Sequence, residues 1–147
     1  MDIWNGKNNN DYRYSLFIEC TSLKEITVDD GVTIIPQYGF KDQTSFETIL
    51  LANSVTNISV CAFDGNSGLR KIWIGKDAAS IGKYAFRNCS NLTIHGISGS
   101  YTEEYATTNN IAFSTETLIY ERVDFQEKLL MNHGKVLMVQ LYTDLRI

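Results

Sequence analysis

The sequence predicts an α/β repeat fold, a solenoid of about four units of about 23 residues each that ends in a C-terminal cap. The first indication is phenylalanine, which recurs at one constant interval at Phe17, Phe40, Phe63 and Phe86. The second is that six further columns of apolar or small residues keep the same period. A constant period of this size is typical of stacked units that each bury an apolar face on the next.

Each unit reads L-x-x-I-x-[VIL]-x-x-x-[VA]-x-x-I-x-x-x-[GA]-F. Ile26 and Val28 alternate with period two, which predicts a short strand with both side chains inward. The V-x-x-I spacing turns the chain back over the same core, and the small residue before each Phe fits a tight helical turn. The aligned columns are Leu23, Phe46, Leu69 and Leu92; Ile26, Ile49 and Ile72; Val28, Leu51 and Ile74; Val32, Val55 and Ala78; Ile35, Ile58 and Ile81; and Gly39, Ala62 and Ala85.

The N-terminal residues 1–16 fit the repeat poorly. Projecting the period backwards places Ile3 in the strand column of Ile26, so the chain begins in the middle of a unit. Polar residues then stand where the other units are largely apolar: Asn8, Asn9, Asn10, Asp11 and Ser15. We expect either a degenerate first unit that caps the solenoid or a truncated one, and the sequence favours neither.

The solenoid is expected to cover residues 17–113 and to end in a capping helix near residues 100–110. The segment from Leu92 to Ile94 is one residue shorter than its counterpart from Leu69 to Ile72, so the register breaks at the fourth unit. Ser100-Tyr-Thr-Glu103 is a capping box, with Glu103 and Glu104 in the first helical turn. Tyr101 and Tyr105 share one helix face and can cover the last repeat, and Ile111–Phe113 adds a closing strand.

The C-terminal extension, residues 114–147, does not follow the period. A strand is expected within Thr117–Phe125. Leu129–Met131 and Val136–Tyr142 flank a turn of Asn-His-Gly-Lys at 132–135, which predicts a hairpin. These segments are too apolar to lie exposed, so they should cover the solenoid end or contact another chain.

Two stretches carry a resemblance to a known family. They read Cys-Thr-Ser-Leu-Lys-Glu-Ile-Thr-Val-Asp-Asp-Gly-Val-Thr (20–33) and Ser-Ile-Gly-Lys-Tyr-Ala-Phe-Arg-Asn-Cys-Ser-Asn-Leu (80–92). Over about residues 12–113 the chain closely resembles the BspA-like leucine-rich repeat family, found chiefly on bacterial surfaces. The resemblance implies a right-handed leucine-rich repeat solenoid with its strands on the concave side. It also implies an adhesive or protein-binding role, and no enzymatic activity can be carried over.

Composition narrows the function classes and the compartment. The formal net charge of −4 argues against nucleic acid as a partner, which needs a dense basic surface. No apolar run approaches the length that spans a bilayer, so no membrane insertion is expected. The first ten residues lack the apolar core of a secretory signal. By itself the chain reads as cytoplasmic, as a mature product or as a fragment, whereas the resemblance implies a cell-surface or secreted protein.

The sequence offers no recognisable catalytic set, metal site or cofactor motif. His95 and His133 have no partner at metal-ligand spacing, and both are expected to be solvated or capping residues. Asp64-Gly-Asn-Ser-Gly68 lacks the remaining ligands of a calcium loop and reads as a polar loop. Cys20 and Cys89 lie three units apart, too far for a disulfide, and Cys61 is expected to be a packing residue.

The candidate binding residues lie on the outward side of the strands. One column contains Trp4, Thr27, Leu50 and Trp73, and the next contains Asp2, Glu25, Thr48 and Lys71. An aromatic and apolar stripe with a charged rim is typical of a protein interface. The leading hypothesis is therefore a non-enzymatic module that binds a host or bacterial protein or glycan. Two alternatives stay open: the C-terminal segment covers Trp73 as internal packing, or the chain is a spacer that forms a homo-oligomer through its ends and apolar tail.

Overall fold

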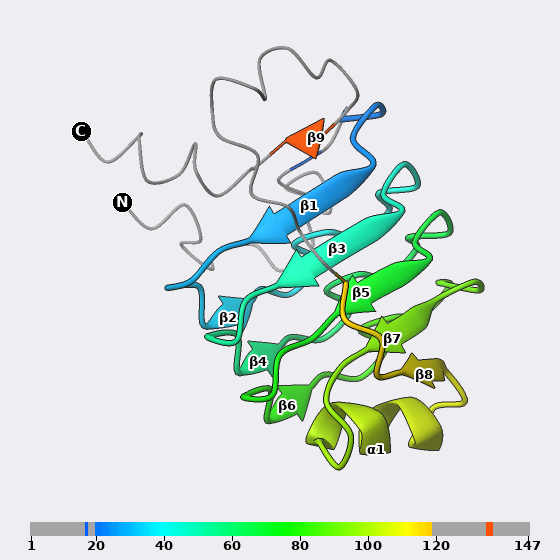
Figure 1. Cartoon of the computed structure of the whole chain (residues 1–147). Coiled ribbons are helices and arrows are strands. Elements are labelled where there is room, and N and C mark those ends of the chain that lie inside the picture. Colours follow the sequence, from blue (N-terminus) through cyan, green and yellow to red (C-terminus); the bar gives the residue numbers. More distant parts are fainter. Residues whose placement is uncertain (1–16, 18–19, 119–134, 137–147) are drawn as a thin grey trace.

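A computed structural model describes Phe17, residues 20–118 and residues 135–136. The described chain forms a parallel β-solenoid of about four turns, which follow one another at the period of the phenylalanines (Figure 1). Six strands form the main sheet in the order β8-β7-β5-β3-β1-β9, and every pair in it is parallel. These strands are β1 (Glu25–Val28), β3 (Thr48–Leu51), β5 (Lys71–Trp73), β7 (Thr93–His95), β8 (Ala112–Ser114) and β9 (Lys135–Val136).

A second, smaller parallel sheet lies where the V-x-x-I spacing was expected to turn the chain back. Its strands have two residues each, in the order β2-β4-β6. The inward residue of each strand is the isoleucine of the repeat, so this sheet lines a second side of the same core. The three strands are β2 (Ile34–Ile35), β4 (Asn57–Ile58) and β6 (Ser80–Ile81).

The four phenylalanines that define the period lie in a single file inside the stack. Phe17 and Phe40 have ring centroids 5.1 Å apart, Phe40 and Phe63 also 5.1 Å, and Phe63 and Phe86 5.3 Å. The rings are nearly parallel, with interplanar angles of 13°, 9° and 4°. Phe46 packs edge-on against Phe17 and Phe40. The predicted column is confirmed, and the core is shared between adjacent units.

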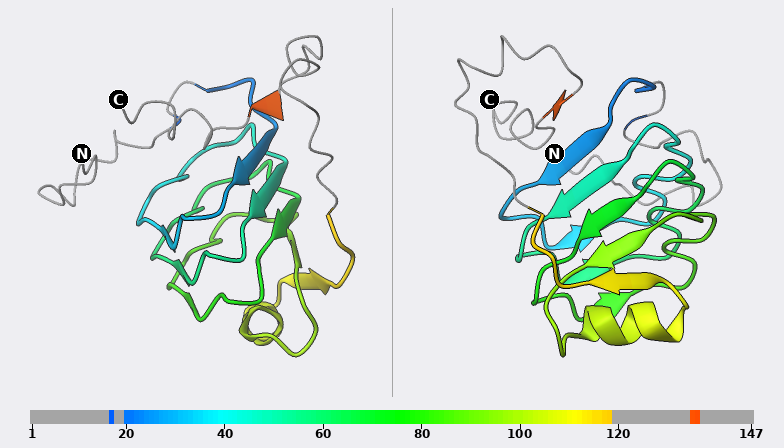
Figure 2. Two further views of the ribbon diagram at one scale, coloured as in Figure 1. Left: turned by 60° about the vertical axis from the view of Figure 1, so that its left-hand side comes forward. Right: turned by 45° about the vertical axis from the view of Figure 1, so that its right-hand side comes forward.

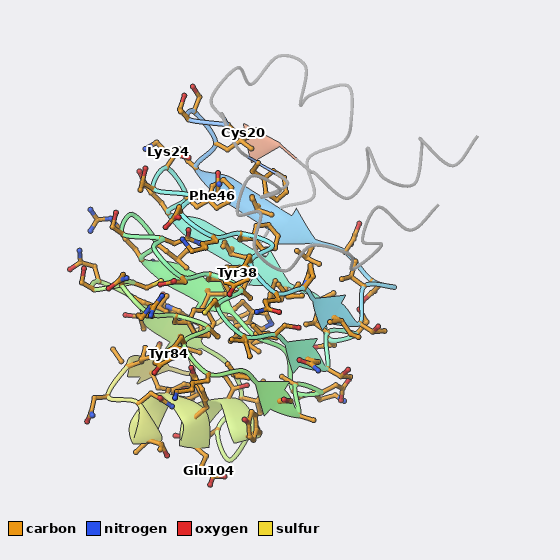
Figure 3. All side chains as sticks on the ribbon, turned by 180° about the vertical axis from the view of Figure 1, so that it is seen from behind. Cys20, Lys24, Tyr38, Phe46, Tyr84 and Glu104 are labelled. Atoms are coloured by element: carbon orange, nitrogen blue, oxygen red, sulfur yellow. The ribbon has the colours of Figure 1, made fainter. Side chains whose placement is uncertain are left out.

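The segment that follows the second sheet in each unit is a turn, and no α-helix lies in the described chain between β2 and β7. Tyr38, Cys61 and Tyr84 occupy the same repeat position and have φ angles of 60°, 54° and 61°. These left-handed residues interrupt any right-handed helix at that point. Backbone bonds join adjacent turns instead, such as Phe40 N–H to Ala62 O at 2.8 Å. The expected helical turn is therefore a run of tight turns, and Figure 3 shows Tyr38 and Tyr84 on this side of the molecule.

Helix α1 (Tyr101–Thr108) covers the end of the stack next to β7 and β8 (Figure 2). Its N-cap is Ser100, whose hydroxyl accepts a hydrogen bond from Glu103 N–H at 3.3 Å. The Glu103 carboxylate accepts from Gly99 N–H at 2.6 Å, one residue before the position that a standard capping box uses. Tyr105 packs edge-on against Phe86, and the Tyr101 hydroxyl accepts from Ile81 N–H at 3.2 Å. The helix thus lies in the stretch where a cap was expected, and β8 follows it.

Within the C-terminal extension the structure describes residues 114–118 and β9. Thr117 and Leu118, where a strand was expected to begin, are not in a strand. Lys135 was expected in a turn, but it begins β9, which pairs in parallel with β1. The register places Glu25 beside Lys135 and Ile26 beside Val136. The rest of the expected hairpin, His133 and all of residues 1–16 with Trp4 lie outside the described residues.

Candidate binding surface on the main sheet

The front face is the side of the main sheet that points away from the core. The pairing register arranges its side chains in two columns. Strand alternation produces this face, because Ile26, Ile49, Ile72 and Ile94 point into the core and their neighbours point outward. The front-face columns are Glu25, Thr48, Lys71, Thr93 and Ala112, and Thr27, Leu50, Trp73, His95 and Ser114.

The accessible part of this face is centred on Lys71 and Trp73. Lys71 is exposed and Trp73 is half-buried, and so are Glu25, Thr27 and Thr48. Leu50 was expected to be exposed, but only 8% of its surface is accessible, which corrects that expectation. Leu50 lies between Thr27 and Trp73 in the register and is not part of the core cluster. It is therefore a buried apolar residue next to Trp73 in the sheet, and it is not a contact residue for a partner.

His95 continues the column of Trp73 and is covered. It is the last residue of β7 and only 3% exposed, so of the two expected roles, solvated or capping, the solvated one was wrong. Its Nδ1 lies 2.9 Å from the backbone oxygen of Glu116. Because a carbonyl can only accept, the Nδ1 atom carries the proton in this contact. The chain after β8 thus folds back over β7 and closes one end of the front face.

A row of charges borders the front face at the turn before each strand. Lys24, Glu47 and Arg70 occupy the same position in successive units, so the sign alternates along the stack. Lys24 Nζ lies 2.9 Å from a Glu47 carboxylate oxygen. The hydrogen bond from Lys24 lowers the pKa of the Glu47 carboxyl, and the charge of Arg70 adds to this effect. Both partners of this pair are about half exposed, so the pair contributes little to stability.

A second charge cluster lies on the turn side, which is the part of each unit that follows the second sheet, and its role is structural. Asp64 is 2% exposed, and its carboxylate accepts from Arg87 Nε at 3.0 Å and Arg87 Nη2 at 2.6 Å. Asn88 Nδ2 adds a third contact at 3.3 Å. Since these side chains already occupy the carboxylate, the Asp64–Gly68 segment is an ordinary polar loop. Within the described ranges, no three His, Cys, Asp or Glu residues are grouped so that they could hold a metal ion.

The three cysteines are free thiols. Cys89 donates to the backbone oxygen of Phe63 at 3.2 Å. Burial raises the pKa of the Cys89 thiol to about 11, so the reactive thiolate is scarce at neutral pH. Cys61 is buried at the left-handed turn position, in agreement with a packing role. The geometry gives these thiols no catalytic setting.

Sequence reasoning missed four members of the front face, which are Thr93, His95, Ala112 and Ser114. Lys71 pairs with Thr48 on one side and with Thr93 on the other, and the second step along the chain is one residue shorter than the first. The turn before β7 is one residue shorter than the turn before β5. β7 therefore stays paired with β5, but each of its residues in a column has a number one lower than the constant period predicts. The short Leu92–Ile94 segment was the signal that could have placed His95 after Trp73. β8 follows at a different spacing, and the sequence held no comparable signal for Ser114.

Comparison with known proteins identifies the repeat. The family model for BspA-type leucine-rich repeat regions matches residues 10–130 as six copies. No curated protein and no solved structure gives a significant match. Within the part of the chain that the structure describes, no helix has both the length and the apolar character needed to cross a membrane. Repeats of this type generally mediate protein interactions on a scaffold that is typically non-enzymatic, and their family is one of surface proteins. The chain belongs to the BspA-type leucine-rich repeat family.

Proposed function

We propose that this protein is a non-enzymatic binding module of bacterial cell-surface type, which adheres to a protein partner through its front face. The contact residues are Glu25, Thr27, Thr48, Lys71 and Trp73. The observation that carries the proposal is Trp73, a half-buried indole on a strand face with the exposed Lys71 two residues away. Trp is among the side chains that contribute most to binding at protein interfaces.

Several features favour a protein over a glycan as the partner. The front face is formed by strands and has charges of both signs along its border, from Lys24 to Arg70. Interfaces between proteins combine an aromatic centre with a polar rim of this kind. Leu50 is the neighbour of Trp73 in the strand register and adds buried apolar surface beside it. The binding screen described below includes oligosaccharides, so it would also detect a glycan partner.

An enzymatic role has less support. His95 is the one histidine that the structure describes, and its imidazole is buried with Nδ1 in contact with Glu116 O. A general base must reach its substrate, and this geometry gives it no free path. Glu25 and Lys71 lie on strands separated by β3, which keeps them apart. In the described part of the chain, the face offers a surface for contact and no set of converging acid and base groups.

The proposal can be tested with a single fluorescent reporter. The chain contains two tryptophans, so a Trp4→Phe variant leaves Trp73 as the sole indole. This variant would be screened against arrays of purified extracellular proteins and of oligosaccharides. We expect a protein hit whose titration shifts the emission of Trp73. Trp73→Ala should weaken that binding roughly 30-fold or more, as expected for an anchor worth at least about 2 kcal/mol.

Tyr84→Ala is the matched control, because Tyr84 is an aromatic residue that is 47% exposed on the turn side. It should leave the affinity unchanged, and thermal unfolding would confirm that both variants stay folded. Binding that survives Trp73→Ala but fails with Tyr84→Ala would move the site to the turn side. A hit confined to oligosaccharides would contradict the protein partner.

A further inference from the structure

The two ends of the stack are closed to very different degrees. At the end with β8, helix α1 covers the last repeat through Tyr105 on Phe86 and through the Tyr101 hydroxyl on Ile81 N–H. At the opposite end the main sheet is closed by β9, which has β1 as its one neighbour in the described sheet. β9 pairs with two residues of β1, whereas β3 pairs with all four. Such a short pairing opens at low cost compared with the rest of the sheet.

β9 reaches β1 by a long route. The sheet order places β8 and β9 at opposite edges, separated by five strand intervals of about 4.8 Å, or about 24 Å in total. The chain between Ser114 and Lys135 contains residues 115–134. Extended, those residues could span more than about 60 Å. A short element near the end of a chain is the kind of element that two copies of a chain can exchange, and the connection is long enough to allow pairing within one chain or between two.

The β1 edge is also built to receive a strand from outside its own unit. Every internal strand of the main sheet pairs in parallel with the strand of the preceding unit, as β3 does with β1. β9 takes this position for β1 with the same parallel direction, although it comes from the far end of the sequence. The edge therefore accepts a parallel strand from outside its own unit, and the pairing itself does not depend on that strand coming from the same chain.

We propose that the β1 edge is a strand-exchange site and that its partner is β9 of a second copy of this chain. In the exchanged form, β9 of each copy pairs with β1 of the other, so the Glu25–Lys135 and Ile26–Val136 register is kept and a reciprocal dimer forms. The contacts at the edge are identical in both forms, and the balance between them is set by protein concentration. This inference does not depend on the front-face binding proposal.

Shortening the connection tests the exchange. Deleting residues 119–134 leaves four residues between Ser114 and Lys135, which can span at most about 18 Å and cannot reach the far edge of the sheet. β9 can then pair only with a second copy. We expect light scattering to give the mass of a dimer for this variant. Deletion of residues 119–147, which also removes β9, is the control and should be a monomer.

Cysteine cross-linking tests the same point in the full-length chain. Strands about 4.8 Å apart fall in the Cα separation that a disulfide requires. A Glu25→Cys chain and a Lys135→Cys chain would be mixed at high concentration and oxidised. We expect a covalent product that contains one copy of each variant, identified by mass spectrometry. Each variant oxidised alone controls for cross-links through Cys20, Cys61 or Cys89.

The outcomes separate the alternatives. A heterodimeric product joined at residues 25 and 135 supports exchange, and so does a dimer that requires β9. A monomeric 119–134 deletion that keeps its thermal unfolding transition would overturn the proposal. Equal dimerisation of both deletions would also overturn it, because the contact would then form without β9. If the short deletion fails to fold, the cross-linking result decides, and its failure at high concentration would refute the exchange.

Discussion

Asp64 has an ionised side chain inside the turn side of the stack, where an uncompensated charge would be costly. Residues 41, 64 and 87 occupy one position in three successive units and are Lys, Asp and Arg, so positive side chains lie on both sides of the carboxylate. The bidentate contact with Arg87 lowers the pKa of the Asp64 carboxyl. The pair thus joins two neighbouring units through side chains, in addition to the shared core.

This pKa shift predicts a definite pH dependence of stability. The folded-state pKa of Asp64 lies below its ordinary value of 3.8, so the ion pair stabilises the fold fully above that value. Its contribution is lost as the pH falls through the lowered folded-state pKa. The unaltered chain should therefore unfold at a higher temperature than Asp64→Asn at pH 7, and the difference should narrow progressively as the pH falls below about 4. Thermal unfolding monitored by circular dichroism over this pH range measures the difference.

Asp77→Asn provides the control for a carboxylate in an exposed pair. Its contact with Lys76 Nζ is 2.7 Å long, but both side chains are about half exposed or more, so little change is expected. The pKa of the Glu47 carboxyl is also lowered, but Glu47 is present in every variant, so its effect cancels in the comparison. A difference between Asp64→Asn and the unaltered chain that did not depend on pH would show that Asp64 acts by packing alone.

Single residues also show where sequence reasoning stops. The column of Tyr38, Cys61 and Tyr84 is visible in the sequence, but nothing in these residue types indicates that all three have positive φ angles. Glycine is the usual residue for that conformation, and none occurs in this column. Adjacent turns hold the conformation in place through backbone bonds, such as Cys61 N–H to Lys83 O at 3.2 Å. Stacking sets this backbone conformation, and residue propensity does not reveal it.

The phenylalanine file shows how one element stabilises its neighbours. Phe63 is fully buried and lies between Phe40 and Phe86 at centroid distances of 5.1 and 5.3 Å. Phe63→Ala would remove contacts with the units on both sides and leave a cavity that backbone-paired turns can hardly collapse. We expect the free energy of unfolding to fall by roughly 3–5 kcal/mol, measured by urea denaturation.

Ile97→Ala is the control for this change, since Ile97 is 47% exposed on the loop before α1. Its effect should stay within about 0.5 kcal/mol. A similarly small loss for Phe63→Ala would mean that the file is not the main source of cohesion between units. The loss of unfolding free energy for Phe63→Leu should lie between the losses for Phe63→Ala and Ile97→Ala, because leucine keeps part of the buried volume.

Strands were predicted correctly where an alternation of apolar residues extends over several positions. They were missed where the strand is too short to show such an alternation. β1, β3 and β5 follow from the alternation of Ile26, Val28 and their counterparts. β2, β4 and β6 are too short for a period to be visible in the sequence. The short fourth unit is visible in the sequence, and its consequence for the register could have been read from it. The shortened step from β5 to β7 brings His95 into line behind Trp73.

At the scale of the whole molecule, each unit contacts chiefly the units before and after it. Stability in such a stack is close to a sum of unit and interface terms, and opening begins at the ends. We therefore expect graded native-state hydrogen exchange. Amides of β3 and β5 should exchange most slowly, because these two strands are in the middle of the sheet and farthest from both of its edges. Amides of β8 and of the β1 edge should exchange faster.

Site-resolved exchange by NMR would measure this gradient. The exchange rates of the α1 amides provide an internal reference for the end of the stack, since this helix closes one end. Uniform protection from β1 to β8 would contradict the prediction, because it would mean that the stack unfolds as a single cooperative unit.

The long-range part of the fold could not be predicted. β9 comes from near the end of the chain, its Lys135 pairs with Glu25 near the start, and no period links the two. The extension is apolar enough to require cover, which the sequence did indicate, but apolar content does not specify a partner. The same reason limits the candidate surface: the columns of Trp73 and Lys71 followed from the period, whereas the cover over His95 depends on a segment outside the repeat.

The fixed register of the main sheet restricts how this protein can change length in evolution. Strands in neighbouring coils pair residue for residue, so a single insertion inside a strand would turn an isoleucine outward and a polar side chain into the core. Gene duplication of one complete coil would preserve every pairing and merely lengthen the rod. Small insertions or losses can persist only in the bends between strands, and the shortened bend before Thr93 is one such loss.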